Sequence, residues 1–504
     1  MSRDGSLPIR NRRTVAMADV PVLPVEELGD ALARWTGDGW RIISLFGLPE
    51  NDQLLRLIAV MSLDGESRLG VTSSIVHQKY PALSSRCRQA SRFEREIAEQ
   101  CGAIPEGHPE LKPLRRQARA DHAPAGWAVV PRDRDQYPFS KVNGDEVHEV
   151  AVGPVHAGII EPGHFRFQAH GEEVLALEIV LGYQHRGAER LLETLALERA
   201  VYVAESLAGD SVIAHTSAFC GAIEALGRSH KSPRAQSLRG IALELERLAN
   251  HIGDLGAMSG DIAYQPAAAY FGRMRGECLN LLMTISGNRY GRGLIRPGGV
   301  AFDITPEMAE EVTDRVQRLR SEVRIVADLF FNTASVQSRL EGVGVVAERD
   351  CLAYGFVGVV ARSAEVRRDV RHDHPYGVFR FAQIPVASAW SGDVYARALV
   401  RWLEIQRSID FVMEQVDALP GGAARSACGA LAPGELVLAL EEGWRGEVAH
   451  TVVTDEKGRV RRHKVTDPSF HNWPAVALAM TGNEMSDFPL CNKSFNLSYA
   501  GHDL

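Results

Sequence analysis

The sequence predicts an α+β protein in which a small N-terminal α/β domain is followed by a larger, α-rich domain. Two observations support this prediction. Short apolar runs alternate with helix-like stretches between residues 28 and about 105, whereas long amphipathic helical patterns dominate after residue 188. The chain of 504 residues is also too long for one ordinary domain, so two or three domains are expected.

The small domain is expected to cover residues 28–115. Within it, the apolar runs Trp40–Phe46 and Leu54–Met61 predict strands, because they are short and rich in large apolar residues. The segment Phe93–Gln100 predicts a charged helix.

Two segments of different composition flank the small domain. Residues 1–27 begin with a polar, arginine-dotted stretch that lacks the apolar core of a secretory signal, and they continue into a Pro-rich run. This composition predicts a flexible arm that docks on a neighbour, if on anything. Residues 116–145 are Pro-rich and highly charged, which predicts a linker.

The second domain is expected to cover residues 146–504. Alternating apolar residues between Phe165 and Ile179, interrupted by Gly171, predict a hairpin. A second alternating pattern around a turn-like insert predicts another hairpin from Val448 to Val465. Between the hairpins, long helical patterns predict an α-rich bundle. They cover Ala188–Ala208, Ser211–Leu226, Arg234–Gly256, Met274–Thr284 and Pro306–Ser335.

The composition limits the environment and the partners. The formal net charge is -8 with mixed signs, which gives no indication of a surface for nucleic acid. No run reaches the roughly 18 consecutive apolar residues that a membrane-spanning helix requires. Seven scattered cysteines, none at Cys-x-x-Cys spacing, indicate a reducing compartment and argue against an iron–sulfur cluster held by this chain alone. A cytoplasmic location is therefore expected.

Several motifs carry a resemblance to known families. The segment Phe93–Lys112, FEREIAEQCGAIPEGHPELK, resembles the signature of the 30 kDa-type subunit of respiratory complex I. The segment Gly153–Phe167, GPVHAGIIEPGHFRF, resembles the start of the 49 kDa-type subunit and is closest to membrane-bound [NiFe]-hydrogenase large subunits. Further motifs continue the resemblance in the same order. They are Tyr183–Arg190, Glu244–His251, Arg371–Tyr376, Gly446–His450 and Phe470–Trp473.

The resemblance implies both an architecture and a set of partners. A fusion of the two subunit types matches formate-hydrogenlyase-type large subunits, in which a 30 kDa-like domain precedes the hydrogenase large-subunit domain. Such a chain is expected to bind a small subunit that carries a [4Fe-4S] cluster. It is also expected to rest on membrane ion-transport subunits related to antiporters, and so to be peripheral on the cytoplasmic face of the membrane.

The ligands of a [NiFe] centre are missing from this chain. In hydrogenases of the family, four cysteine thiolates bind nickel and iron, two from an early helix and two near the C-terminus. Alignment on the flanking motifs places these positions at Ala208, Ser211, Ser498 and Gly501. Soft metals need thiolates, and serine, alanine and glycine do not supply them. The sequence therefore predicts no metal site and no hydrogen turnover.

Quinone is a candidate substrate, although its usual contacts are also missing. Complex I places a tyrosine and a histidine at the quinone headgroup, and counting from the motifs puts these positions at Gly209 and Ile160. His156 matches an earlier histidine of the same motif and is a candidate cofactor-binding residue. Another substrate, or a quinone bound differently, stays open.

Proton transfer is the chemistry that the remaining polar residues suggest. The resemblance matches Glu161 to a proton-conducting glutamate of hydrogenases; His164 follows closely, and His215 is a third candidate. A carboxylate in a partly dry cleft can titrate near neutral pH, which suits proton transfer. The alternative is a structural Glu161 that pairs with Arg166 or with a backbone amide.

Asp210 lies between two of the former ligand positions, where the family has an apolar residue. It is a further candidate for carrying a proton. Together with Ser498 and His502, it can also be arranged around a hard cation such as magnesium. The alternative is a helix-end cap, or a hydrogen bond that fills the space left by the metal.

His251 matches a histidine that faces the partner's iron–sulfur cluster in complex I, where a protonatable group couples electron affinity to proton affinity. The alternative is a satisfied buried residue, since His251 is a lone histidine on a helix. On the same helix, Arg239, Glu246 and Arg247 predict a network of ion pairs.

Three functions follow from these observations. The leading one is the large subunit of a hydrogenase-related, complex-I-like membrane-associated oxidoreductase that lacks the [NiFe] site. It would couple electron and proton transfer near a partner-held cluster and would hold no cofactor itself. The alternatives are a non-catalytic scaffold of an ion-translocating membrane complex and a quinone reductase subunit with non-standard headgroup contacts. No Gly-rich strand-to-helix fingerprint occurs, so any NAD link would lie in a partner subunit.

Overall fold

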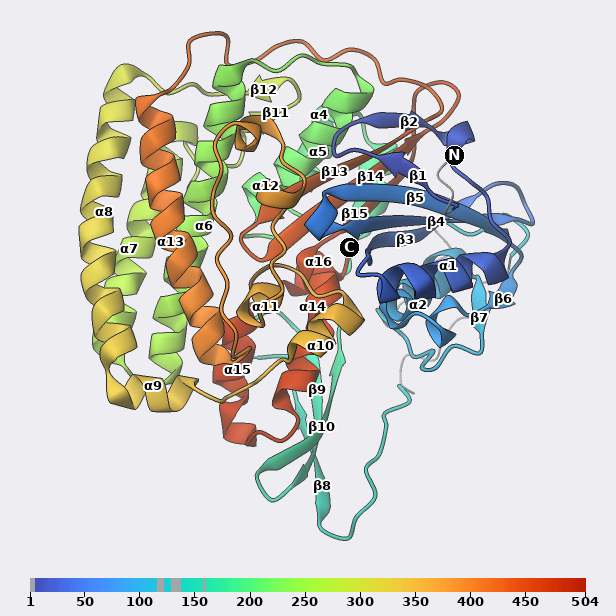
Figure 1. Ribbon diagram of the computed structural model, residues 1–504, viewed down its shortest axis with the longest axis horizontal. Helices are drawn as coiled ribbons and strands as arrows, with labels where there is room; N and C mark the ends of the chain where they lie inside the picture. Colours follow the sequence, from blue (N-terminus) through green and yellow to red (C-terminus); the bar gives the residue numbers. More distant parts are fainter. Residues whose placement is uncertain (1–4, 116–121, 128–136, 157–159) are drawn as a thin grey trace.

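The computed structural model describes residues 5–115, 122–127, 137–156 and 160–504. A four-stranded sheet with two helices forms the N-terminal domain, and long helices with further sheets form the remainder (Figure 1). The predicted α+β class is confirmed. The expected linker falls partly outside the described residues, which include only 122–127 and 137–145 of it.

The N-terminal sheet has the strand order β1–β5–β4–β3, with antiparallel pairing throughout. Both of its faces are covered, because neighbouring side chains of β3 point into different cores. Leu45 packs with the helices, whereas Phe46 packs in the main core of the α-rich domain. The elements are β1 (Leu7–Ile9), α1 (Val25–Gly37), β3 (Arg41–Pro49), β4 (Leu55–Leu63), β5 (Arg68–Val76) and α2 (Ser91–Cys101).

The segment expected to be a flexible arm is tied into the fold where the structure describes it. Strand β1 pairs with β5, and β2 (Thr14–Ala16) pairs with β13 (Glu435–Gly443) of the α-rich domain. Ile9 and Val20 are buried in the main core. The expectation of an arm on a neighbour is therefore wrong for these residues, because their short apolar stretches complete two sheet edges of the same chain.

Four long helices stand together on the left of Figure 1, with α6 packed on α7 and α13, and α8 packed on the same two helices. They are α6 (Pro233–Asp261), α7 (Gln265–Ser286), α8 (Pro306–Asn332) and α13 (Val394–Asp417). Side-chain caps fix three of their N-termini: Ser232, Thr305 and Asp393 each accept a hydrogen bond from a backbone amide in the first turn. None of the described helices combines the length and apolar character needed to cross a membrane.

The single helix predicted for Ala188–Ala208 is wrong. The chain forms α3 (Ala188–Thr194) and α4 (Leu197–Ala204), because Leu195 and Ala196 adopt extended backbone conformations between them. The break lets α3 pack on β15 while α4 packs on α5 (Val212–Leu226). Tertiary packing thus overrides a continuous helical pattern.

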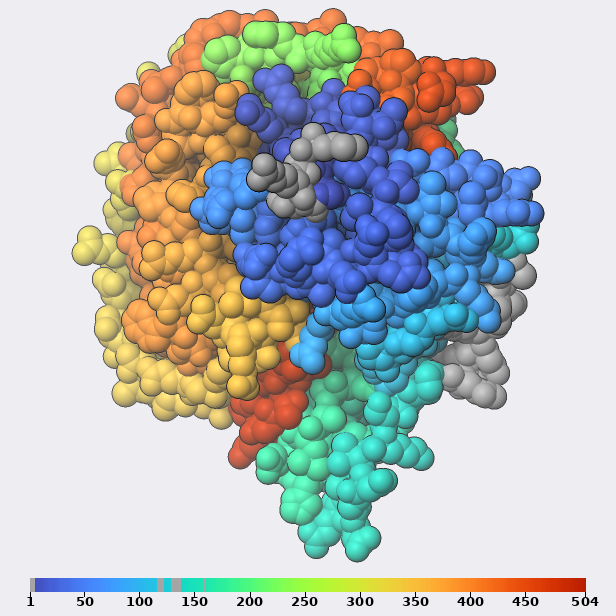
Figure 2. Space-filling model, turned by 45° about the vertical axis from the view of Figure 1, so that its right-hand side comes forward, coloured from blue at the N-terminus to red at the C-terminus, as the bar shows by residue number. Residues whose placement is uncertain are grey.

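Both predicted hairpins are confirmed. Strands β9 (His164–His170) and β10 (Glu173–Val180) turn at Gly171, whose φ of +58° suits glycine. With β8 (Val147–Val152) they form a three-stranded ribbon that projects from the molecule in Figures 1 and 2. Strands β14 (Gly446–Thr454) and β15 (Val460–Thr466) join β13 and β2 in the second four-stranded sheet.

The C-terminal segment lies between the two domains, and the N-terminal domain is seated directly on the α-rich one (Figure 2). Its helices are α14 (Pro468–Met480), α15 (Phe488–Phe495) and α16 (Tyr499–His502). The remaining short elements are β6 (Lys79–Pro81), β7 (Ile104–Glu106), β11 (Ile295–Arg296), β12 (Gly299–Val300), α9 (Ala334–Leu340), α10 (Glu348–Tyr354), α11 (Gly358–Ser363) and α12 (Val370–Asp373).

Candidate functional site

The four former ligand positions predicted from the sequence are buried and lie around one site, called here the former-ligand site. Two precede α5 and two lie at the start of α16. Arg445, from the turn between β13 and β14, donates a hydrogen bond to one member of the first pair. Asp467, at the start of α14, fills the space beside one member of the second pair. The four positions are Ala208, Ser211, Ser498 and Gly501.

Asp467 occupies the place of a side chain at Gly501. An ideal Cβ on Gly501 would lie 2.6 Å from Asp467 Cγ and 2.7 and 2.8 Å from its two oxygens. The carboxylate is fixed there by the Ser469 amide at 2.7 Å and by His215 Nε2 at 2.9 Å. Burial alone would raise the pKa of Asp467, but the His215 hydrogen bond and nearby Arg445 hold it below the usual value.

Arg445 brings a positive charge to the former-ligand site. Its two terminal nitrogens donate to the carboxylate of Asp210 at 2.6 and 2.8 Å, and one of them also reaches Ser211 Oγ at 3.1 Å. The guanidinium stacks on Trp444 at 3.9 Å from the ring centroid. Asp210 is therefore an ion-pair partner and not a helix cap, and Ser211, at the cap position of α5, makes no side-chain cap.

A [NiFe] centre does not fit these residues. The four positions offer no thiolate, Asp467 fills the space beside Gly501, and a guanidinium rather than a metal neutralises the carboxylates. Within the described ranges, no group of three or more histidine, cysteine or acidic side chains is arranged to hold a metal ion.

The three residues considered for a hard cation are not assembled either. Both oxygens of Asp210 face Arg445, and Ser498 Oγ accepts from the Gly501 amide at 2.9 Å. His502 turns away toward Asp503, to which its Nδ1 lies at 2.7 Å. The magnesium alternative is therefore wrong for this arrangement.

Three fully buried histidines lead away from Asp467 in single file, called here the histidine file. His215 contacts Asp467 through Nε2, and its Nδ1 lies 3.3 Å from Nε2 of His450. His450 Nδ1 in turn lies 2.9 Å from Nε2 of His463. Helix α5 and the paired strands β14 and β15 supply one histidine each, so the file depends on tertiary packing.

The hydrogen bonds give the file one direction. An ionised Asp467 accepts the Nε2 proton of His215. In the arrangement with a neutral His215 ring, His215 Nδ1 accepts from His450, and His450 Nδ1 accepts from His463. The last nitrogen, His463 Nδ1, is buried and has no hydrogen-bond partner among the described residues. Burial lowers the pKa of His450 well below its ordinary value and that of His463 to about 4, so both rings are neutral at pH 7. If a proton first enters at His463 Nδ1, one transfer in each hydrogen bond releases a proton to Asp467 and leaves all three rings neutral with their protons on Nδ1.

Glu161 lies against the C-terminal turn. Its Oε2 accepts a hydrogen bond from the Tyr499 amide at 3.3 Å, at the start of α16. Burial raises the pKa of Glu161, and Arg445 acts in the opposite direction. Of the two structural alternatives, the backbone amide is the actual partner, because Arg166 pairs with Glu149 instead. A buried carboxyl with a raised pKa can hold and release a proton.

His164 and His156 have contacts in the β8–β9 region. His164 Nδ1 lies 3.3 Å from the carbonyl oxygen of Gly153, and its Nε2 accepts from Arg166 at 3.4 Å. His156 Nε2 lies 2.9 Å from the carbonyl oxygen of Gly163. These contacts join the described residues at the end of β8 to those at the start of β9.

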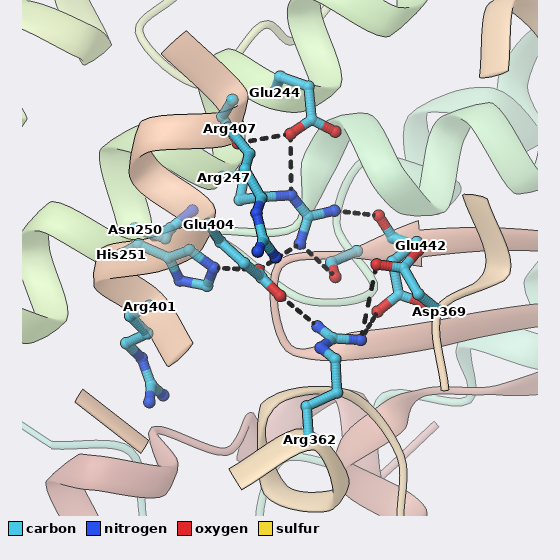
Figure 3. A network of polar contacts seen from close by, with 12 residues as sticks. Glu244, Arg247, Asn250, His251, Arg362, Asp369, Arg401, Glu404, Arg407 and Glu442 are labelled. Atoms are coloured by element: carbon cyan, nitrogen blue, oxygen red, sulfur yellow. Dashed lines mark hydrogen bonds and ion pairs between the residues drawn. The ribbon is translucent and has the colours of Figure 1, made fainter. Parts of the chain in front are cut away.

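His251 belongs to a buried ion network between α6 and α13 (Figure 3). Its Nε2 lies 2.7 Å from Glu404, whose carboxylate also pairs with Arg247 at 3.2 Å and with Arg362 at 2.7 Å. Burial lowers the pKa of His251 to about 4, although Glu404 acts in the opposite direction. His251 Nδ1 is buried without a hydrogen-bond partner, and the ring packs edge-on against Trp444.

One carboxyl of this network can change its charge near neutral pH. Burial, with Asp369 close by, raises the pKa of Glu442 to about 7, although Arg362 lowers it. The Glu442 carboxylate accepts from Arg362 at 2.8 Å and from the Val370 amide at 3.0 Å. Four acids and three arginines are ion-paired here, and the Arg407 guanidinium also acts on Glu404 and Asp369, so the network carries nearly balanced charge. The members are Glu244, Asp369, Glu404, Glu442, Arg247, Arg362 and Arg371.

The ion network predicted for Arg239, Glu246 and Arg247 on α6 is wrong for Glu246. Arg239 pairs with Glu224 at 2.6 Å, in place of a partner on its own helix. Glu246 pairs with no arginine but accepts hydrogen bonds from the Ile213 and Ala214 amides, at 2.7 and 3.2 Å, in the first turn of α5. Burial raises the pKa of Glu246 to about 8, although these two amides act in the opposite direction.

Sequence reasoning missed four residues of the site. Asp467 precedes Pro468, which is a signal for the start of a helix and not for a metal-site replacement. His450 and His463 lie on strands of the correctly predicted hairpin, so counting across the hairpin register was a usable signal. Arg445 lies in the turn before that hairpin and carries no local signal of its role.

The chain is similar to large subunits of hydrogenase and complex-I-like complexes. A family model described as "Respiratory-chain NADH dehydrogenase, 49 Kd subunit" matches residues 261–433 and 428–503. Formate hydrogenlyase subunit 5 of Escherichia coli (strain K12) is 28% identical over 443 residues, covering 84% of this chain and 77% of the relative. Hydrogenase-4 component G of the same strain is 26% identical over 489 residues, covering 92% and 84%.

A fused relative accounts for the N-terminal part. The C/D subunit of the NADH-quinone oxidoreductase of Bacteroides thetaiotaomicron is 26% identical over 462 residues, covering 84% of this chain and 85% of the relative. The predicted resemblance to a hydrogenase-type large subunit joined to a 30 kDa-type domain is therefore confirmed. The chain is related to subunits of hydrogenases and of complex-I-like oxidoreductases.

Proposed function

We propose that this chain is the large subunit of a complex-I-like, membrane-associated oxidoreductase complex that moves electrons and protons without a [NiFe] centre. The single observation that carries the proposal is the pairing of two features. The former-ligand site is filled by Asp467 and Arg445, and a directed file of buried histidines ends on that same Asp467. A site that had only lost its metal has no need of a directed proton path.

The proposed chemistry divides between this chain and its partner. A [4Fe-4S] cluster in a small partner subunit would supply one-electron transfer when bound. The histidine file would deliver protons to Asp467, and Glu161 would hold a proton beside the same turn. His251 and Glu442 would adjust their protonation within the buried ion network as the partner's charge changes. Membrane ion-transport subunits are the proposed neighbours, on the cytoplasmic face.

The experiment begins with the native membrane assembly of this chain. Mass-spectrometric metal analysis should find nickel far below one atom per chain, and iron that matches only the partner's clusters. The cluster's midpoint potential, followed by electron paramagnetic resonance, should fall with rising pH by up to about 59 mV per unit. His251→Met should flatten this slope, whereas exposed His170→Gln should leave it unchanged.

Two results of these measurements would contradict the proposal. Stoichiometric nickel or hydrogen production by the assembly would restore a hydrogenase assignment. Equal slopes for the wild type and His251→Met would show that His251 does not link electron and proton transfer.

A non-catalytic scaffold is the second candidate, because the filled space beside Gly501 also suits a site that no longer binds a substrate. Turnover with a short-chain quinone separates the two functions. Sustained quinone reduction through the cluster would support the oxidoreductase and identify quinone as the acceptor. A reducible cluster without turnover for any acceptor tested would favour the scaffold.

A further inference from the structure

A cavity of about 730 Å³ lies at the seam between the two domains, and none of the histidine file lines it. Helix α2 and the turn before it form one wall, and β10 and α14 form the other. The first wall is cationic, with Arg88, Arg92 and Arg95. The second wall is largely apolar and includes Phe470 and Trp473.

Arg92 has no carboxylate partner among the described residues. It donates a hydrogen bond to Nε2 of His502 and lies over the ring of Phe470 at 5.6 Å, while its own Nε is buried without a partner. The nearest charged groups include two further cations, Arg95 and Arg115. Burial, together with these cations, lowers the pKa of Arg92 to about 9, although Tyr137 and the Asp503 carboxylate beyond His502 act in the opposite direction. An arginine so placed needs an anion to balance it.

Arg95 and Arg88 on this wall also lack carboxylate partners among the described residues, whereas Arg86 on the same wall pairs with Asp30. Arg95 donates to the carbonyl oxygens of Lys112 and Pro113, each at 2.8 Å, and Arg88 stacks over Tyr354 at 5.0 Å. Ser84 lines the same cavity, is 6% exposed, and has a buried hydroxyl without a hydrogen-bond partner. Glu110 and Glu178 also line the cavity, but both pair with Lys112. The three arginines and the Ser84 hydroxyl therefore have no carboxylate acceptor among the described residues.

We propose that this interdomain cavity binds a small molecule that carries a phosphate group, with the phosphate at Arg92 and Ser84 and an apolar body against Phe470 and Trp473. The volume suits a small molecule, and guanidinium groups bind phosphate oxygens through paired, charge-assisted hydrogen bonds. The site is separate from the proposed redox function.

Occupancy of the cavity is linked to the C-terminal turn. His502, the hydrogen-bond partner of Arg92, donates to Asp503, and Asp503 accepts from the Gly182 and Gln184 amides. A phosphate that draws Arg92 toward itself competes with His502 for the guanidinium. Ligand binding therefore acts on α16, which carries Gly501 of the former-ligand site.

Isothermal titration calorimetry of the full chain with pyrophosphate, in phosphate-free buffer of low ionic strength, tests the proposal. We expect one saturable site in the wild type. Arg92→Gln should weaken binding at least about tenfold, the loss expected for one charge-assisted hydrogen bond. Arg318→Gln is the matched control, because Arg318 is exposed on α8, away from the cavity lining.

Exposed Arg88 provides a second variant that does not depend on a buried position. Arg88→Gln should weaken binding in the same direction, and Arg92→Lys should retain part of it because it keeps the charge. ADP should bind more tightly than pyrophosphate, since its ring can use the apolar wall. Absence of saturable pyrophosphate binding by the wild type would overturn the proposal. So would equal binding by Arg92→Gln, Arg88→Gln and Arg318→Gln.

Discussion

The carboxylate of Asp467 stands where a side chain on Gly501 would have to lie, with its Cγ only 2.6 Å from the ideal Cβ position. The two residues cannot both keep their places if Gly501 gains a side chain, since no pair of carbon atoms packs this closely. A side chain at position 501 and the Asp467 carboxylate in its present place therefore exclude each other. His215 then holds the carboxylate in place at 2.9 Å.

Gly501→Cys should destabilise the protein by about 1–3 kcal/mol, the range typical of overpacking in a well-packed interior. The new side chain must push Asp467 away from His215 or shift α16. Urea unfolding of the full chain measures the change. Gly209→Cys is the control, because a Cβ there meets nothing within 4 Å. Equal losses for the two variants would show that the space beside Gly501 is not specifically filled.

Arg445→Met should destabilise the protein by about 2 kcal/mol. Removing one partner of a buried pair costs about 3–5 kcal/mol, but the Asp210 side chain is 33% exposed, so solvent screens part of the charge that remains. The double variant Arg445→Met/Asp210→Asn should lose less than the sum of the single variants, because it leaves no unpaired carboxylate at position 210. Additive losses in urea unfolding would contradict this coupling.

Nitrogen-15 NMR of the histidine rings should detect neutral Nε2–H tautomers for His450 and His463 at pH 7. The His463 signal should change near pH 4, since burial lowers its pKa to about that value. Because this pKa lies below the unfolded value of about 6.5, the stabilisation is complete above pH 6.5 and is lost as the pH falls toward 4. An Nδ1–H tautomer of His450 at pH 7 would reverse or break the file.

Local periodicity accounts for the parts of the fold that the sequence predicts well. Helices α5 to α8 and both hairpins follow from the spacing of apolar residues within single segments of the sequence. The break between α3 and α4 does not, because it is set by packing on β15 and α5. The site follows the same rule. The resemblance pointed to Ser211 and Ser498 as positions of the site. The contacts of Asp467 and Arg445 could not be predicted, because they join segments that are distant in the chain and depend on the assembled fold.

Glu246 supplies a pH dependence whose sign is opposite to that of the histidines. Burial raises its pKa to about 8 in the folded protein, whereas an unfolded glutamate titrates near 4.3. Between these values the folded state binds the proton more tightly than the unfolded state. Its contribution to stability is therefore complete below about pH 4 and is lost as the pH rises toward 8, by at most about 1.4 kcal/mol per unit.

Glu246→Gln should remove this loss, because glutamine cannot ionise. Its one oxygen can keep the shorter hydrogen bond from the Ile213 amide, and the loss of the Ala214 hydrogen bond adds a cost that does not vary with pH. Unfolding free energies measured by urea at several pH values should therefore give a variant that gains on the wild type from pH 5 to 8 and then levels off. Glu310→Gln, on the exposed surface of α8, is the matched control and should run parallel to the wild type. A constant difference between Glu246→Gln and the wild type across this range would mean that Glu246 is ionised in the folded protein throughout, with its charge stabilised by the two amides at the start of α5.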